Sequence, residues 1–109
     1  MAKMMNKRLE LHELLCEVLG SRNVYFQPPE SVKMRYPAIV YSRNRIENTS
    51  ADNIVYKQDL SYKITVIDPD PDSEIVERVS TIPGIMYDRP YVSNNLNHDV
   101  FTLFYVVSF

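Results

Sequence analysis

Three aspartates separated by prolines, Asp68, Asp70 and Asp72, have the spacing closest to that of a chemical site. Carboxylates at positions one, three and five begin a calcium-binding loop, which also needs a glycine at position six and an acidic residue at position twelve. Ser73 and Val79 occupy those two positions here. The sequence therefore predicts a corner between a strand and a helix and no calcium site. An alternative, a hydrolase or nuclease subunit built around these aspartates, stays open.

The two histidines offer little for catalysis. His12 lies in a predicted helix with Cys16 four residues on, and two ligands without two more do not make a metal site. An exposed or edge His12 and a buried, hydrophobic Cys16 thiol are expected instead. His98 precedes Asp99, but neighbouring side chains of an extended chain point apart, so the pair does not orient an imidazole as a catalytic triad does. We expect no catalytic residue, no metal, no cofactor and no enzyme activity.

Composition indicates one domain, residues 1–109, that folds in a reducing compartment. A chain of this length buries ~65% of its unfolded surface, which suffices for one core. Its 12 basic and 14 acidic side chains give a net charge of −2, so no overall field draws it to nucleic acid or to an anionic membrane. The single cysteine cannot form an internal disulfide. With no targeting segment or apolar run that would span a bilayer, we expect a soluble, cytosolic protein without small-molecule substrate or sequence-specific nucleic-acid binding.

Hydrophobic periodicity predicts the elements around the aspartates. Residues 56–66 alternate between apolar and polar side chains, which is typical of a strand with one buried face. The prolines after Asp68 stop this strand, and Asp72 or Ser73 is expected to cap a helix over residues 73–82. A first helix is predicted over residues 3–19. Each helix is expected to end at a glycine, the first at Gly20 and the second at the Pro83-Gly84 pair.

The remaining segments predict further strands. These are residues 24–26, 36–41, 86–92 and 100–109. Residues 93–99 are expected to form a turn, and residues 47–53, of which six are polar, are expected to form a loop at a hairpin tip, where contact with a partner is often made. The predicted fold is a small α+β domain with an antiparallel or mixed sheet of about four strands, packed by two helices on one face.

The last strand is apolar on both faces. Phe101, Leu103, Tyr105, Val107 and Phe109 fall on one face, and Val100, Phe104 and Val106 fall on the other. The two helices can cover the first face. Two interpretations of the second face remain open: a neighbouring subunit covers it, or the strand is central and covered by the chain's own loops.

The pattern as a whole resembles the small tail-completion or tail-terminator proteins of long-tailed bacteriophages, the group of the lambda-type tail terminator and the head-to-tail joining proteins. The segments that carry the resemblance are residues 15–20, 36–41, 48–53, 56–67 with the following turn and helix, and 95–105. The resemblance covers nearly the whole chain. It rests on the order of the elements and on the local amino-acid sequence of these segments, because such a family has no catalytic signature.

The resemblance implies a structural protein of a phage or prophage, made in the host bacterial cytoplasm and placed in the virion at the head-tail junction. Its subunits are expected to form a ring, a hexamer, that caps the tail tube, ends tube polymerisation and meets the head connector proteins. The alternative is a cytosolic adaptor module that pairs a sheet edge with a partner chain.

Two sets of residues are predicted for contacts, from exposure and apolarity alone. The partner-contact set, for the tail tube protein or the head connector, is Arg43, Arg45, Glu47, Asn48 and Asp52. The subunit-interface set is Phe104, Val106 and Phe109.

Overall fold

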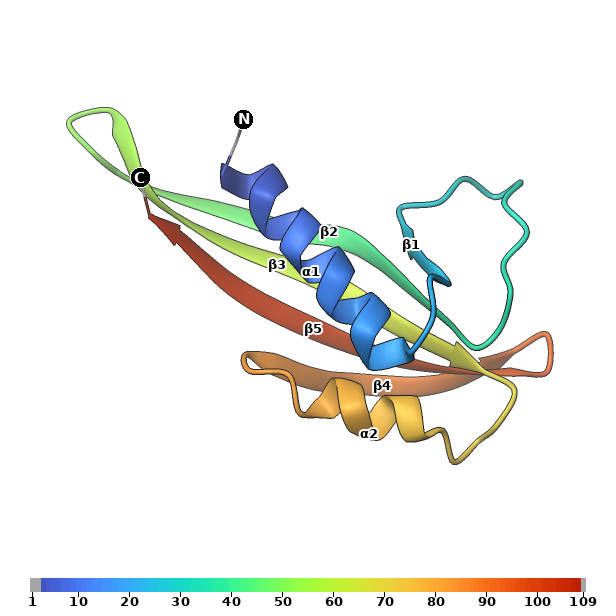
Figure 1. The fold of residues 1–109 in the computed structure, drawn as a ribbon. Coiled ribbons are helices and arrows are strands. Elements are labelled where there is room, and N and C mark those ends of the chain that lie inside the picture. The colour runs from blue at the N-terminus through green and yellow to red at the C-terminus, as the bar shows by residue number, and fades with distance from the viewer. Residues whose placement is uncertain (1–2, 109) are drawn as a thin grey trace.

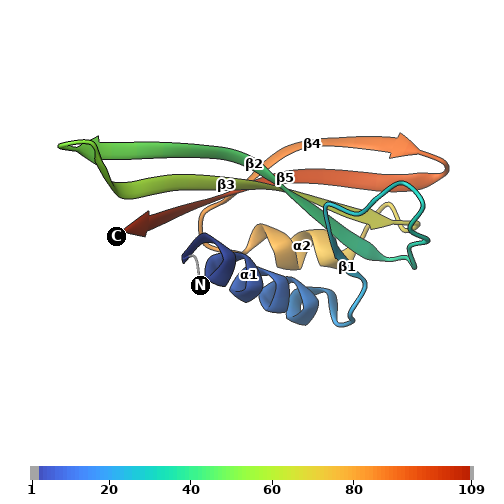
Figure 2. The same ribbon diagram turned by 90° about the horizontal axis from the view of Figure 1, so that it is seen from above.

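One mixed five-stranded sheet with two helices on one face makes up the computed structural model, which describes residues 3–108 (Figures 1 and 2). The α+β class and the placement of the helices are confirmed, and the sheet has five strands where about four were expected. The elements in chain order are α1 (Lys3–Leu19), β1 (Val24–Phe26), β2 (Ala38–Ala51), β3 (Ile54–Asp68), α2 (Glu74–Ser80), β4 (Ile85–Ser93) and β5 (Leu96–Ser108).

The strands lie in the order β1-β2-β3-β5-β4. β1 pairs with β2 in parallel, and every other neighbouring pair is antiparallel. Two hairpins of this sheet close through two-residue turns. Asp52 and Asn53 join β2 to β3, and Asn94 and Asn95 join β4 to β5. All four residues have positive φ angles, 52°, 64°, 53° and 62°, as a type I′ turn requires, and asparagine and aspartate tolerate that conformation better than most residues.

These tight turns correct two expectations. Residues 47–53 are not a loop, because β2 continues to Ala51 and only Asp52 and Asn53 turn. Residues 93–99 are likewise mostly strand, since β5 begins at Leu96. Polar strand residues resemble loop residues in composition, and here only the pairs Asp-Asn and Asn-Asn marked where the chain reverses.

Capping chemistry confirms the predicted start of the second helix and end of the first. The predicted end of the second helix at the Pro83-Gly84 pair is wrong, because α2 ends at Ser80 and Thr81 is its C-cap, with its N–H donating to the carbonyls of Arg78 and Val79. The side chain of Ser73 accepts a hydrogen bond from the backbone N–H of Ile75 at 3.2 Å and is the N-cap of α2. Gly20 follows α1 with a φ of +82°, and its N–H donates to the carbonyl of Cys16 at 2.9 Å.

The core lies between the helices and one face of the sheet, called here the inner face. Alternation along the strands places the apolar register of β3 and β5 on this face. Tyr62, Phe101 and Leu103 are at most 1% exposed there, under Leu11 and Leu15 of α1. The opposite, outer face has no helix over it in the described chain (Figure 2).

The sheet is longer than the helices that cover it, and the molecule measures 52 × 26 × 23 Å. The β2–β3 hairpin extends past the beginning of α1 (Figures 1 and 2). We call residues 45–61, together with residues 104–108 of β5 beside them, the arm. Within the arm, residues 45–49, 57–61 and 104–108 pair row by row as a regular three-stranded block.

We predict that Gly84→Ala destabilises the fold by about 2 kcal/mol, more than Gly20→Ala, which should cost about 1 kcal/mol. Both glycines have a φ of +82°, so an added Cβ is strained in either. A Cβ at Gly84 would also lie 3.1 Å from the carbonyl oxygen of Phe104, whereas nothing lies within 4 Å at Gly20. Urea unfolding of both variants measures the difference, and equal losses would mean that the Gly84 contact relaxes freely.

Candidate functional site

Part of each predicted contact set lies together on the outer face of the arm. Ser61 of β3 is opposite Arg45 on one side and Phe104 on the other. Asp59 is in turn opposite Glu47 and Val106. Because residues in one row of a sheet point to the same side, these six side chains share a face. We call this surface the arm face; it consists of Arg45, Glu47, Asp59, Ser61, Phe104 and Val106.

The arm face combines exposed apolar groups with paired charges. Phe104 is 53% exposed and Val106 is 58% exposed. Arg45 donates to the Glu47 carboxylate at 2.5 Å. Both side chains, with Asp59 and Phe104, line a shallow hollow of about 90 Å³. Large apolar side chains beside charged ones are typical of surfaces that bind proteins, and the arrangement offers contact area and ion pairing to a partner.

The other predicted contact residues lie elsewhere. A β-bulge between Arg43 and Arg45 shifts the register, so Arg43 is opposite Tyr62 of the inner-face register while Arg45 belongs to the outer one. Asn48 is opposite Gln58, whose amide donates to it at 2.9 Å on the inner side. Asp52 is in the hairpin turn, and Phe109 lies outside the described residues. The partner-contact set is therefore spread over both faces and the tip of the arm.

A polar centre on the outer face, beside the arm, was missed from the sequence. Asp88 of β4 accepts hydrogen bonds from Lys63 and from the Thr102 hydroxyl, each at 2.7 Å. The bond to Lys63, then the bond to Thr102, lowers the pKa of the Asp88 carboxyl. The sequence did place Lys63 in the polar register of β3, and this was the one signal for the polar centre. That Lys63 lies beside Thr102 of β5 and Asp88 of β4 depends on strand pairing, which the sequence does not give.

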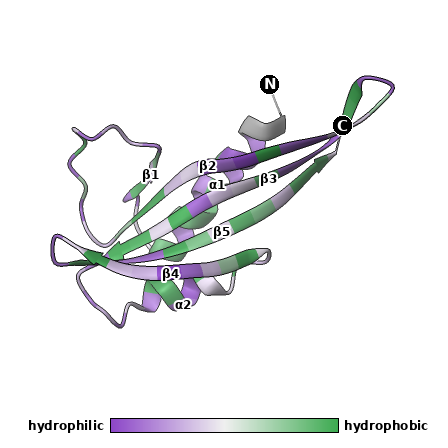
Figure 3. Ribbon diagram, turned by 180° about the vertical axis from the view of Figure 1, so that it is seen from behind, coloured by the Kyte–Doolittle hydropathy of each residue, from purple (hydrophilic) through white to green (hydrophobic). Residues whose placement is uncertain are grey.

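Figure 3 shows the sheet from its outer side, with the ribbon coloured by the hydropathy of each residue. Thr102 is buried although it is polar, and it lies between Lys63 and Met86 in one row of the sheet. Phe104 is two residues further along β5, and Val106 is two beyond that. The apolar part of β5 on this face is therefore its C-terminal end, within the arm.

His12 and Cys16 do not form a joint site. The Nδ1 atom of His12 is 2.7 Å from the hydroxyl of Tyr41, whose ring is 1% exposed. Burial, followed by the positive charge of Arg22, lowers the pKa of His12. Cys16 is 6% exposed, and burial raises the pKa of its thiol, as the prediction of a buried hydrophobic cysteine required.

His98 and Asp99 point to different partners, as expected for neighbours in a strand. The imidazole of His98 stacks on the ring of Tyr91, with centroids 4.5 Å apart and planes inclined by 16°. The carboxylate of Asp99 accepts from the hydroxyl of Tyr87 at 2.8 Å. The pair therefore lacks the geometry of a catalytic dyad.

The aspartate corner is held by its own backbone. Asp68 accepts from the N–H of Asp70, and Asp70 accepts from the N–H of Asp72, both at 2.9 Å. Each carboxylate thus closes a turn two residues ahead. Among the described residues, no group of three or more histidines, cysteines, aspartates or glutamates is placed to hold a metal ion.

Comparisons with known proteins add no family. No protein-family model matches the chain, and no curated protein matches it. In the part of the chain that the structure describes, no helix is long and apolar enough to cross a membrane. The features that support a functional proposal are therefore those of the chain itself, and the arm face is the first of them.

We predict that Asp70→Ala costs about 0.5 kcal/mol of stability and leaves calcium and magnesium titrations unchanged, because its carboxylate accepts one exposed backbone hydrogen bond. Asp68→Ala, the matched control, should cost more, about 1–2 kcal/mol, because Asp68 is 9% exposed and the hydrogen bond that it accepts is partly buried. Urea unfolding and calorimetric titration measure both effects. Cation binding by the wild type that Asp70→Ala abolishes would favour the metal-dependent alternative.

We predict that the protein loses stability as the pH falls from about 7.5 to about 5.5, in part through His12. Its pKa is lowered in the folded state, so the unfolded chain binds the proton more readily and stability declines as the pH drops through the ordinary value of 6.5. His12→Gln should reduce this decline. Tyr41→Phe removes the hydrogen-bond partner of His12 but keeps the burial and the Arg22 charge that lower its pKa, so it should keep the decline of the wild type. A decline in His12→Gln as large as in the wild type would rule out His12 as its source.

Proposed function

We propose that the chain is a structural protein of a long-tailed phage or prophage that caps the tail tube as a ring, ends its polymerisation and forms the head-tail joining interface. In this proposal it is not an enzyme, and its partners are further copies of itself, the tail tube protein and the head connector proteins. It would be assembled in the host bacterial cytoplasm and become part of the virion at the head-tail junction.

The observation that supports the proposal most is the uncovered apolar end of β5. Phe104 and Val106 are more than half exposed on a face that no described helix covers. Exposed apolar groups of this size on adjacent alternate positions are costly in a free monomer and are stabilised when a neighbouring subunit buries them. The sequence resemblance to tail-terminator proteins supplies the identity of that neighbour as a second copy in a ring.

The arm supports the second half of the proposal. It projects from the helix-covered body and presents paired charges beside apolar groups, so it can reach a partner above or below a ring. A subunit that ends tube growth needs two different contacts, one with its own copies and one with the tube. The apolar end of β5 is one such surface, and the tip of the arm at Asp52 and Asn53 is another.

An adaptor module that binds a partner through a sheet edge is the second candidate. β4 favours it, because it is an outer strand whose residues 86–93 are all exposed and whose second edge has no described strand beside it. Strand addition to such an edge is a common mode of peptide recognition. Light scattering of the purified protein, alone and mixed with the candidate tail tube protein, separates the two functions. A ring-sized species supports the terminator, and a monomer that ignores the tube supports the adaptor.

We predict that Phe104→Asp abolishes assembly while the subunit stays folded, because a carboxylate cannot be buried in the interface without a partner. Val92→Asp is the matched control: Val92 is 70% exposed at the far end of β4, and its substitution should leave assembly intact. Light scattering measures mass, and circular dichroism measures folding. An unfolded Phe104→Asp subunit would instead place Phe104 in the core.

A further inference from the structure

β5 continues beyond the end of its neighbour β4. The last paired residues are Ile85 and Leu103, and the carbonyl of Gly84 then accepts from the N–H of Phe104 at 3.2 Å. On its other side β5 stays paired with β3 along the whole arm. Past Phe104, no strand of the described chain lies beside Tyr105 to Val107 on the side that β4 has left. The arm therefore has an open strand edge here.

The opposite edge of the arm is open as well. β1 pairs only with Ile39 to Tyr41 of β2, and Gln27 then accepts from the N–H of Arg43 at 3.1 Å. Residues 45–49 pair with β3 alone in the described chain. Register shifts lie between Arg43 and Arg45 and between Thr49 and Ser50, so the bulges frame this segment and do not interrupt it.

The two open edges lie in the same rows of the sheet. Residues 45–49 are paired with residues 57–61 of β3, and the open residues 105–107 of β5 are paired with residues 58–60 of that same segment. Backbone groups alternate in direction along a strand, and the N–H of Phe104 points away from β3, so that of Val106 does too. On β2, the N–H of Arg43 points away from β3, and the following bulge transfers this direction to Ile46 and Asn48.

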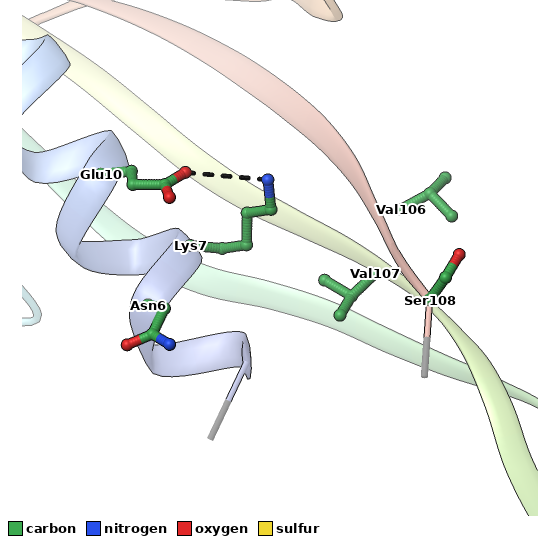
Figure 4. A pocket seen from close by; sticks show the side chains of 6 residues that line it. All are labelled: Asn6, Lys7, Glu10, Val106, Val107 and Ser108. Carbon is green, nitrogen blue, oxygen red and sulfur yellow. Dashed lines mark ion pairs between the residues drawn. The ribbon is translucent and has the colours of Figure 1, made fainter. Parts of the chain in front are cut away.

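A groove lies under the β5 edge. It has a volume of about 420 Å³ and lies between the first turns of α1 and the end of β5 (Figure 4). Lys7 and Glu10 of α1 form an ion pair of 3.7 Å along it, and Val107 points toward the helix while Val106 points away (Figure 4). The groove therefore has an apolar floor and a charged wall.

Ile46 has the properties of an occupant for this groove. It belongs to the inner register of β2, opposite Leu60, yet it is 40% exposed. If residues 45–49 of a second copy lay along the β5 edge with the same face inward, Ile46 would lie against Val107 and α1. Arg45 and Glu47 of that copy would lie beside Phe104 and Val106 on the outer face.

We propose that copies of the chain join by continuing the sheet, with residues 45–49 of β2 in one copy added as a strand beside residues 105–107 of β5 in the next. This inference rests on the proposed ring and specifies its interface. Each copy offers one edge of each kind, so the contact is heterologous and closes into a ring when the rotation between copies divides a full turn. Glu47 and Asn48 of the partner-contact set would then meet Val106 of the subunit-interface set across one interface.

β4 is the competing edge, and its own features argue against it. Pro90 lacks an N–H, and a bulge between Tyr87 and Arg89 breaks the register. Prolines and bulges on outer strands are devices that prevent edge-to-edge pairing. The β5 edge in the arm carries neither between Phe104 and Val107.

Cross-linking between cysteines tests the pairing directly. In a Cys16→Ala background, Glu47→Cys with Val106→Cys places one thiol on each open edge of the same face. Oxidation to disulfides, under the conditions in which the wild type assembles, should give a ladder of covalent oligomers that ends at the ring. The two thiols of one copy are two strands, about 9.5 Å, apart and cannot form a disulfide with each other. Each single-cysteine variant should stop at a dimer. The matched control, Glu47→Cys with Val92→Cys, tests the β4 edge and should give no ladder.

The outcomes separate this inference from the proposed function. A wild-type protein that stays monomeric alone and with the tube protein overturns both. A wild-type ring with a ladder from the Val92 pair, or from neither pair, overturns the sheet continuation and leaves the ring in place. A ring with a ladder from the Val106 pair alone supports both.

Removal of one outward N–H gives an independent check. Val106→Pro should raise the concentration for half-assembly at least about tenfold, because it deletes a backbone donor of the open edge but no bond to β3. Asn48→Pro tests the other edge in the same way. Val106→Thr keeps the N–H and the branched shape and should assemble as the wild type does. Unchanged assembly of both folded proline variants would overturn the proposal.

Discussion

The structure depends on a mismatch in length between its helices and its strands. A helix rises 1.5 Å per residue and a strand about 3.3 Å, so the 17 residues of α1 cover about 25 Å whereas the 15 residues of β3 span about 50 Å. Helix α2 is only seven residues long, and residues 3–108 contain no third helix to cover the rest of the strands. Half of the long strands therefore lie over a core and half form the arm.

This mismatch explains the amino acids of the arm. Over the core, inner-face residues of β3 such as Tyr62 and Ile64 are large and buried. At the base of the arm Leu60 and Val107 are still buried, but further out the same register holds Gln58, which is half-buried, and Tyr56, which is 48% exposed. Beyond Leu60 the strands are held by their hydrogen-bond ladder and by side-chain pairs such as Gln58 with Asn48. Strands of this kind are stable as part of a sheet, and a further strand paired with them would add more stability here than over the core.

The same feature limited what the sequence could predict. Alternation predicted the buried face of β3 and of β5, and capping chemistry predicted Ser73 and Gly20, because these signals are local. Residues 47–51 of the arm strand were expected to belong to a loop because they are polar, but this polarity accompanies a strand that pairs with β3 and has little core to cover. The separation of Arg43 from Arg45 onto different faces depends on a bulge, which no periodicity reveals.

The outer face of the sheet has two chemically different regions, a polar one over the helix-covered body and an apolar one toward the arm. Over the body, Lys63, Asp88 and Thr102 satisfy one another across three strands, so that region has a polar centre with its groups already paired. Toward the arm, Phe104 and Val106 have exposed apolar surface that nothing in the described chain satisfies. A partner gains little free energy by burying charges that are already paired, since it must also remove their water, and it gains more from apolar area. The preferred contact therefore shifts away from the centre of the sheet to its arm, where the open strand edges also lie.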